Sequence, residues 1–155
     1  NASAAPERRR IFAAAMEGES PPEIKKIQGM NRKILIADDE VHIRMLLGQT
    51  LEDLVDENEV ELFFADNGET TLELIQSEQP RLVILDVMMP KMNGMEVCDR
   101  VKNDLGLQDV FIVLLTAKGQ EVDRKKGSEV GANQYMTKPF DPDRLLGLAR
   151  EVLAL

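Results

Sequence analysis

The stretch LVILD at residues 82–86 indicates the fold class of this chain of 155 residues. Four consecutive apolar residues followed by an aspartate are typical of a strand that is buried on both faces of a parallel sheet. The same pattern precedes the acidic pair in ILIADD at residues 34–39. Short apolar runs of this kind predict five strands, at 34–37, 60–65, 82–85, 110–115 and 134–137.

Segments with the apolar spacing of helices alternate with these strands. The predicted helices are 40–54, 67–78, 94–105, a weaker one at about 120–130, and 142–155. Because strands alternate with helices along the chain, we expect a parallel sheet with helices on both faces, a three-layer α/β sandwich. The continuously apolar strands at 82–85 and 110–115 should lie centrally.

Composition excludes several classes of protein. A hydrophobic fraction of 43% and a charged fraction of 30% are values of a globular chain, not of a disordered or fibrous one. A net charge of −9 argues against direct nucleic-acid binding, which depends on basic surface. The single cysteine, Cys98, excludes an intramolecular disulfide and a thiolate zinc site. No apolar run reaches the roughly 18–20 residues of a membrane helix, so we expect no membrane partner and a soluble, cytoplasmic protein.

The first 29 residues differ from the rest of the chain. They hold five basic and four acidic side chains, whereas residues 30–155 carry a net charge of −10. Asn1 and Ala2 resemble the scar of a cleaved expression tag. Residues 6–17 predict a short helix with Ile11, Phe12, Ala15 and Met16 on one stripe. We therefore expect a short helical extension or linker at 1–29 and a globular domain at 30–155.

Polar residues follow four of the predicted strands. They are Asp38, Asp39, Asp86, Thr116 and Lys138. Because ligands of open α/β sheets bind at the carboxyl ends of the strands, these side chains should converge. Either aspartate of the first pair could cap the next helix, but carboxylates at about 4 Å repel by roughly 4 kcal/mol at an effective dielectric of 20. A divalent cation or Lys138 must offset this repulsion, and carboxylates that leave room for water favour Mg²⁺.

Four motifs at these strand ends resemble the receiver domains of two-component response regulators. They are LIADDE, DVMMPKMNG, LLTAKG and YMTKPF, and the resemblance covers residues 32–155. Each motif is weak by itself, whereas their order at successive strand ends is specific. The resemblance implies a CheY-like, flavodoxin-like sandwich with five helices and a five-stranded sheet in the order 2-1-3-4-5.

The resemblance also implies a role for each matching residue. Asp86 would accept a phosphoryl group from a sensor histidine kinase or a histidine phosphotransfer protein. Asp38, Asp39, Asp86 and the backbone carbonyl of Met88 would bind Mg²⁺. Thr116 and Lys138 would hold the phosphoryl oxygens, and Thr116 and Tyr135 would switch the face of helix 4, strand 5 and helix 5 toward a partner. Such a chain is a signalling module that assists its own phosphorylation and autodephosphorylation, not an enzyme that turns over a substrate.

Three alternatives bear on this hypothesis. A haloacid-dehalogenase-type phosphatase also uses an aspartate nucleophile and Mg²⁺, but it requires an acid where this chain has Met88. A flavin-binding electron carrier would need a hydroxyl- or glycine-rich loop after the first strand, where this chain has Asp-Asp-Glu. A receiver cut from a hybrid kinase or a multidomain regulator fits the residues equally well. Its partner would be a downstream effector protein or a missing output domain.

Overall fold

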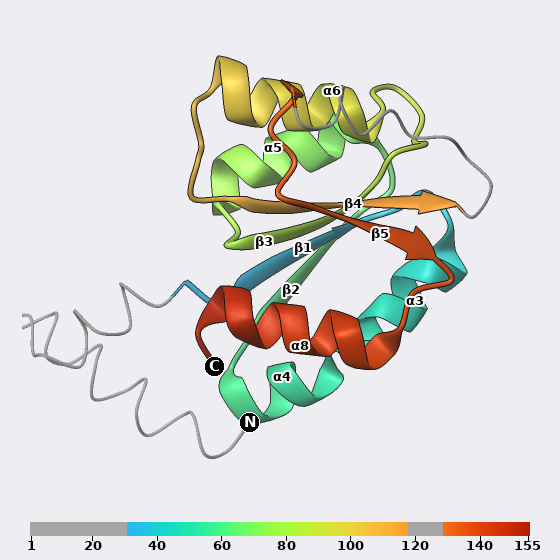
Figure 1. Cartoon of the computed structure of the whole chain (residues 1–155), viewed down its shortest axis with the longest axis vertical. Helices are drawn as coiled ribbons and strands as arrows, with labels where there is room; N and C mark the ends of the chain where they lie inside the picture. The colour runs from blue at the N-terminus through green and yellow to red at the C-terminus, as the bar shows by residue number, and fades with distance from the viewer. Residues whose placement is uncertain (1–30, 118–128) are drawn as a thin grey trace, which may run out of the picture.

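A computed structural model gives the fold, and it describes residues 31–117 and 129–155. One parallel sheet has the strand order β2-β1-β3-β4-β5, which confirms the predicted order (Figure 1). The strands are β1 (Lys33–Ala37), β2 (Glu61–Ala65), β3 (Leu82–Asp86), β4 (Phe111–Ala117) and β5 (Gln134–Lys138). The predicted helix at 6–17 and nearly all of the weaker one at 120–130 lie outside the described residues.

Helices cover both faces of the sheet, as the three-layer prediction requires (Figure 1). One face packs against α3 (Val41–Thr50), α4 (Glu52–Asn58) and α8 (Pro142–Leu153). The other packs against α5 (Gly68–Glu78) and α6 (Gly94–Asp99), which continues into the π-helical turn η1 (Arg100–Asp104). Alternate residues of β1 therefore enter two separate cores, with Ile34 and Ile36 in one and Leu35 in the other.

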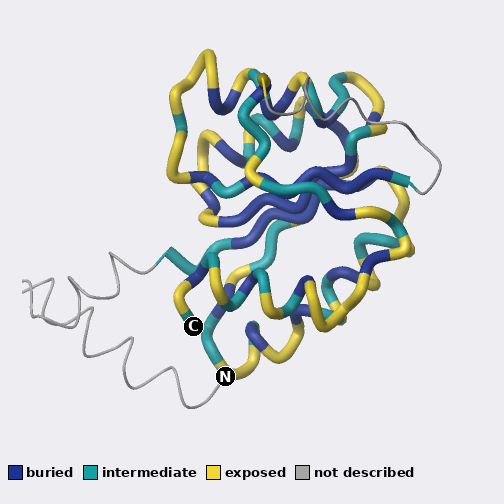
Figure 2. Tube along the Cα trace, viewed as in Figure 1, coloured by how far each residue is buried: buried dark blue, intermediate teal, exposed yellow. Residues whose placement is uncertain are grey.

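The interior strands are the most buried part of the molecule (Figure 2). All five residues of β3 are buried, and β3 occupies the middle position of the sheet with β4 beside it. This confirms the prediction that the continuously apolar strands lie centrally. Among the described residues, no helix has the length and apolar character that crossing a membrane demands.

The expected single helix at 40–54 is two helices. The helical geometry breaks at Leu51, and α4 continues from Glu52 to Asn58. Glu52 and Asp53 then stand in the first turn of a new helix, where negative side chains are stabilised by the helix dipole. Leu51, at the break, and Leu54 of α4 are both fully buried in the core beneath the sheet.

Side-chain caps fix where three helices begin. Asn67, Asn93 and Asp141 accept backbone N–H bonds at the starts of α5, α6 and α8. Such caps contribute about 1 kcal/mol each. The cap at Asn93 bears on the site, because α6 starts only eight residues after the end of β3 and so confines the loop that follows Asp86.

Candidate functional site

Asp86 ends the central strand and is nearly inaccessible, with a relative exposure of 4%. Its Oδ1 accepts a hydrogen bond from the backbone N–H of Met88 at 3.2 Å. Burial, and next the charge of Asp38, raise the pKa of the Asp86 carboxyl from 3.8 to about 6, although Lys138 and the Met88 N–H oppose the shift. The group is therefore mainly a carboxylate at neutral pH, with little water around it.

Lys138, at the end of β5, reaches both buried aspartates. Its Nζ lies 2.6 Å from Asp38 Oδ2 and 3.4 Å from Asp86 Oδ2, and its side chain is only 13% exposed. Burial by itself would lower the pKa of the ammonium, but the hydrogen bond to Asp38 and the charges of Asp38, Asp86 and Glu40 outweigh it and raise the pKa. Lys138 thus offsets part of the expected carboxylate repulsion.

The first strand ends in an acidic group. Carboxylate oxygens of Asp38, Asp39 and Glu40 all lie within 4.8 Å of one another, with Asp38 fully buried and the other two exposed. Hard carboxylate oxygens at this spacing, with open sides left for water, fit the coordination of Mg²⁺. Neither aspartate caps α3: its N-cap is Glu40, which makes no side-chain cap bond, and Asp38 Oδ1 accepts from the Glu40 N–H at 2.9 Å.

Backbone contacts hold Asp38 in place. Its N–H donates to the carbonyl of Ala65 at 3.1 Å, which ties it to the neighbouring strand. Arg44 Nη1 donates to the Asp38 carbonyl at 2.6 Å. The Arg44 side chain therefore anchors the start of α3 to the strand end.

Thr116 and Tyr135 come from adjacent strands. Thr116 is buried, and it follows Leu115, the residue of β4 that pairs with Asp86. Tyr135 is partly buried, on β5 beside Leu114, and packs against the core on the α5 and α6 side. Met88 is 59% exposed, next to the buried Asp86.

Gly94 permits the tight loop after Asp86. Its N–H donates to the carbonyl of Val87 at 2.9 Å. A Cβ at this position would lie 2.3 Å from the carbonyl oxygen of Asp86 and 3.0 Å from Cα of Val87. Only glycine allows the backbone of α6 to approach the end of β3 this closely.

The structure brings Asp38, Asp86 and Lys138 together as the sequence predicted. It adds Glu40 and Arg44, to which sequence reasoning gave no role. Glu40 could have been found from the sequence, because it is the third acid of the run Asp-Asp-Glu. No neighbouring residue in the sequence indicates that Arg44 would contact Asp38. The acidic group within 4.8 Å contains Glu40 and not Asp86. The predicted metal ligands and switch residues remain predictions.

Comparison with known proteins agrees with this geometry. Residues 34–150 match the family described as the response regulator receiver domain. The chain is 41% identical over 127 residues to the probable transcriptional regulator ycf27 of Porphyra purpurea, covering 82% of this chain and 49% of that protein. It is 40% identical over 124 residues to the alkaline phosphatase synthesis transcriptional regulatory protein PhoP of Bacillus subtilis, covering 80% and 49%.

The fold is also similar to solved structures. The chemotaxis response regulator CheY4 of Vibrio cholerae superposes with a TM-score of 0.67 at 30% identity, covering 79% of this chain and 98% of that one. The chain spans about half the length of the curated relatives named above. Since the family match covers most of the chain and the site stands at the expected strand ends, this protein belongs to the response regulator receiver family.

Proposed function

We propose that Asp86 accepts a phosphoryl group from a phosphorylated histidine of a sensor kinase or a phosphotransfer protein. The observation that carries this proposal is the position of Lys138, whose Nζ lies 3.4 Å from the buried Asp86 carboxylate. A buried carboxylate beside an ammonium can attack an anionic donor, because the positive charge stabilises the phosphoryl oxygens, and the hydroxyl of Thr116 would donate to the same oxygens.

The transfer balances as a single displacement. A carboxylate oxygen of Asp86 forms a bond to phosphorus while the phosphorus–nitrogen bond of the phosphohistidine breaks. The electron pair of that bond stays on the imidazole nitrogen, and Asp86 becomes an acyl phosphate. Charge on the equatorial phosphoryl oxygens is stabilised by Lys138 and by the hydroxyl of Thr116.

Asp38, Asp39 and Asp86, with the carbonyl of Met88, would hold Mg²⁺, and Glu40 is close enough to contribute through its carboxylate. The ion supplies charge neutralisation for the phosphoryl oxygens when it is bound. Lys138 already offsets part of the negative charge of the site, and its contacts with Asp38 and Asp86 hold the two carboxylates near each other.

A phosphatase of the haloacid-dehalogenase type is disfavoured by the residue two positions after Asp86. Met88 has a thioether that is 59% exposed, and its backbone N–H bonds to the nucleophile. A thioether cannot act as the acid and base that release product in that chemistry. We therefore propose a signalling role in which each phosphoryl group changes the state of the domain.

The first experiment locates the phosphoryl group. The full chain is incubated with Mg²⁺ and acetyl phosphate, and the added mass is mapped by peptide mass spectrometry after borohydride trapping. We expect one modification, on Asp86, that is absent from Asp86→Asn. Asp104→Asn, an exposed change of the same kind, should leave the modification in place. Undiminished labelling of Asp86→Asn, or sustained turnover of phosphoesters, would overturn the assignment.

The readout is proposed to pass through Thr116 and Tyr135. As Thr116 approaches the phosphoryl oxygens, Tyr135 turns inward and reshapes the face of β5, α8 and the predicted helix at about 120–130. Beryllofluoride with Mg²⁺ should change amide exchange most within residues 116–140. Thr116→Ala should abolish that change while Asp86 stays occupied. Equal exchange with and without an occupied Asp86 would contradict this switch.

A second candidate adds to the first: the chain is the receiver part of a longer regulator or hybrid kinase. This second candidate is favoured because the chain matches only about half the length of its curated relatives. The output would then come from a domain joined to this one, and otherwise from a separate effector protein. Receiver chemistry at Asp86 is the same in both cases.

A further inference from the structure

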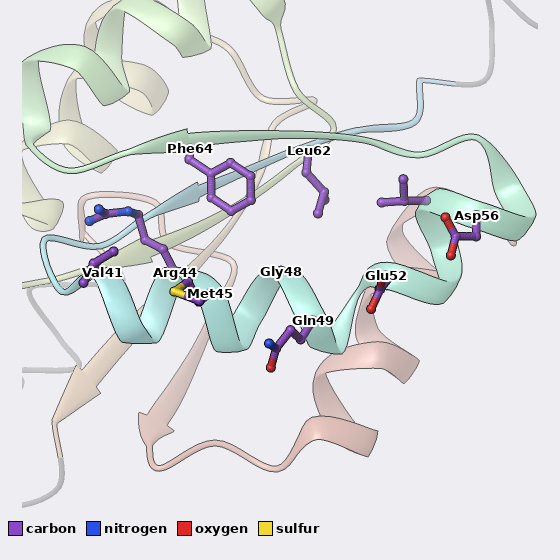
Figure 3. Close-up of a pocket in the computed structure, with 10 residues that line it drawn as sticks. Val41, Arg44, Met45, Gly48, Gln49, Glu52, Asp56, Leu62 and Phe64 are labelled. Carbon is purple, nitrogen blue, oxygen red and sulfur yellow. The ribbon is translucent and has the colours of Figure 1, made fainter. Parts of the chain in front are cut away.

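An apolar groove runs along α3, α4 and the edge strand β2. Its volume is about 590 Å³. Val41, Met45 and Phe64 line it and are 60%, 59% and 47% exposed. Figure 3 shows Phe64 and Leu62 projecting from β2 toward α3, with Gly48 on the facing helix. Exposed apolar side chains gathered along one groove are typical of an interaction site.

The groove exists because β2 is the edge of the sheet and α3 packs farther in. Leu47 of α3 and Leu51, at the junction of α3 and α4, enter the core beneath the sheet. Gly48 keeps the floor of the groove open: an added Cβ there would lie 3.4 Å from Cζ of Phe64. A larger residue at position 48 would fill the space that the Phe64 ring now faces.

The sequence outside the described residues contains a segment that fits this surface. Residues 6–17 carry an apolar stripe of Ile11, Phe12, Ala15 and Met16, preceded by the basic run Arg8-Arg9-Arg10. As a helix, these twelve residues would be about 18 Å long. Val41 and Asp56, the first and last lining residues on α3 and α4, are 15 positions apart, which is roughly 22 Å of helical rise. A helix of residues 6–17 is therefore short enough to lie along the groove.

The described chain starts at the α4 end of the groove. Arg32 Nη1 donates to the carbonyl of Asn58, the last residue of α4, at 2.7 Å. The backbone N–H of Glu61 donates to the carbonyl of Arg32 at 2.9 Å. The 14 residues 18–31 can span up to about 45 Å, so they can return from either end of the groove.

The α4 end of the groove is uniformly acidic. Residues 52–61 contain six acids and no base, and Glu52 and Asp56 line the groove itself. The opposite end is mixed: Arg44 lines it, and the exposed acids Asp39 and Glu40 directly precede Val41. A helix that places Arg8-Arg9-Arg10 near α4 therefore sets the basic run beside the end that carries acids alone.

We propose that residues 6–17 of this chain dock in the α3–β2 groove through the stripe of Ile11, Phe12, Ala15 and Met16, with the arginine run against the acidic end of α4. This intramolecular contact covers exposed apolar surface on the side of the sheet edge. It makes the extension part of the domain surface, and anything that lies before residue 6 in a longer protein would be held at that edge.

A single-tryptophan reporter tests the proposal in the full chain. The sequence has no tryptophan, so Phe64→Trp supplies the only one, in the groove. In this background, Ile11→Asp with Phe12→Asp should move the emission to longer wavelength and remove protection from acrylamide quenching. Ala13→Asp with Ala14→Asp, off the stripe, adds the same charge and should leave both signals unchanged. Circular dichroism checks that each variant folds.

Other outcomes overturn the proposal. Identical emission in the two double variants would show that the stripe does not cover the groove. Protection that disappears on dilution, together with dissociation of a dimer in sedimentation, would identify a second copy as the occupant. If the stripe variant does not fold, Glu52→Lys provides the test from the groove side, because it repels the arginine run and should also expose the reporter. An unchanged reporter in that variant counts against the proposal.

Discussion

At the scale of single residues, the site depends on one lysine placed between two buried aspartates. Lys138 contacts Asp38 closely and Asp86 less closely, at 2.6 and 3.4 Å. Burial, and next the charge of Asp38, raise the pKa of Asp86 to about 6, and the contact with Lys138 offsets only part of that rise. The Asp86 carboxyl is therefore mainly ionised at neutral pH and is not held in a tight ion pair.

The raised pKa of Asp86 predicts how stability changes with pH. Between pH 3.8 and about 6 the folded state keeps a proton that the unfolded state has released. Without Mg²⁺, the free energy of unfolding should therefore fall as the pH rises through this range. A shift of about two pKa units corresponds to about 3 kcal/mol as an upper figure.

Asp86→Asn should remove this fall in the free energy of unfolding, and the variant should be more stable than the parent at pH 7 without Mg²⁺. Urea unfolding at pH 4, 5, 6 and 7 measures the difference. Asp104→Asn, an exposed change of the same kind, should keep the slope of the parent. If Asp86→Asn shows the same slope as the parent, then another group causes it and the burial of Asp86 is not the reason.

At the scale of elements, the loop between β3 and α6 sets the geometry around Asp86. The Asn93 cap fixes the start of α6, and Gly94 brings that start against the backbone of Asp86. The Met88 N–H then points at the Asp86 carboxylate. Two local features of the sequence, a cap and a glycine, thus act directly on the surroundings of Asp86.

Gly94→Ala should destabilise the domain, because its Cβ would lie 2.3 Å from a backbone oxygen that cannot move without shifting β3. We expect a loss of at least about 2 kcal/mol. The rate of labelling by acetyl phosphate should also fall, since the clash is with Asp86 itself. Thermal and urea unfolding measure the first effect, and timed mass spectrometry measures the second.

Gly147→Ala is the matched control. Gly147 lies in α8, and an added Cβ there meets no atom within 4 Å. Gly147→Ala should raise the free energy of unfolding by up to about 1 kcal/mol through helix propensity, and it should leave the rate of labelling unchanged. Equal effects of the two substitutions would show that the close approach at Gly94 does not constrain the site.

At the scale of the whole molecule, the acidic site and the two cores are coupled. The carboxylates of Asp38 and Asp86 lie at the carboxyl ends of β1 and β3, and the two faces of this sheet form separate cores. Charge that is only partly neutralised there acts against folding of the entire domain. Any ligand that binds the folded site alone must then stabilise the whole chain by mass action.

Mg²⁺ should accordingly raise the unfolding temperature. At 100 times its dissociation constant the gain is about 2.7 kcal/mol, or roughly 10 °C for a domain of this size. Asp39→Asn should weaken this response, because Asp39 is an exposed member of the acidic group, and it should not weaken the metal-free fold. Glu52→Gln, on α4, should keep the full response. A parent protein whose unfolding temperature is unmoved by Mg²⁺ would contradict the metal site.

The sequence by itself determined which segments become strands and in what alternation they meet helices. Apolar runs and helical spacing are local signals, and they located all five strands to within two residues of their observed bounds. The polar residues at the strand ends also follow from local order, because parallel strands place their carboxyl ends at one edge. The strand order itself came from the resemblance to a family, not from any local pattern.

Only the tertiary structure decided the distances on which the chemistry depends. The contact of Lys138 with Asp38 joins residues that are 100 positions apart, and its length depends on how β1, β3, β4 and β5 lie side by side in the sheet. The contact of Arg44 with the Asp38 carbonyl likewise depends on how α3 packs against the end of β1. The spacing of apolar residues in a segment determines whether it forms a helix or a strand. The distances between side chains of different segments depend on long-range packing, which no single segment encodes.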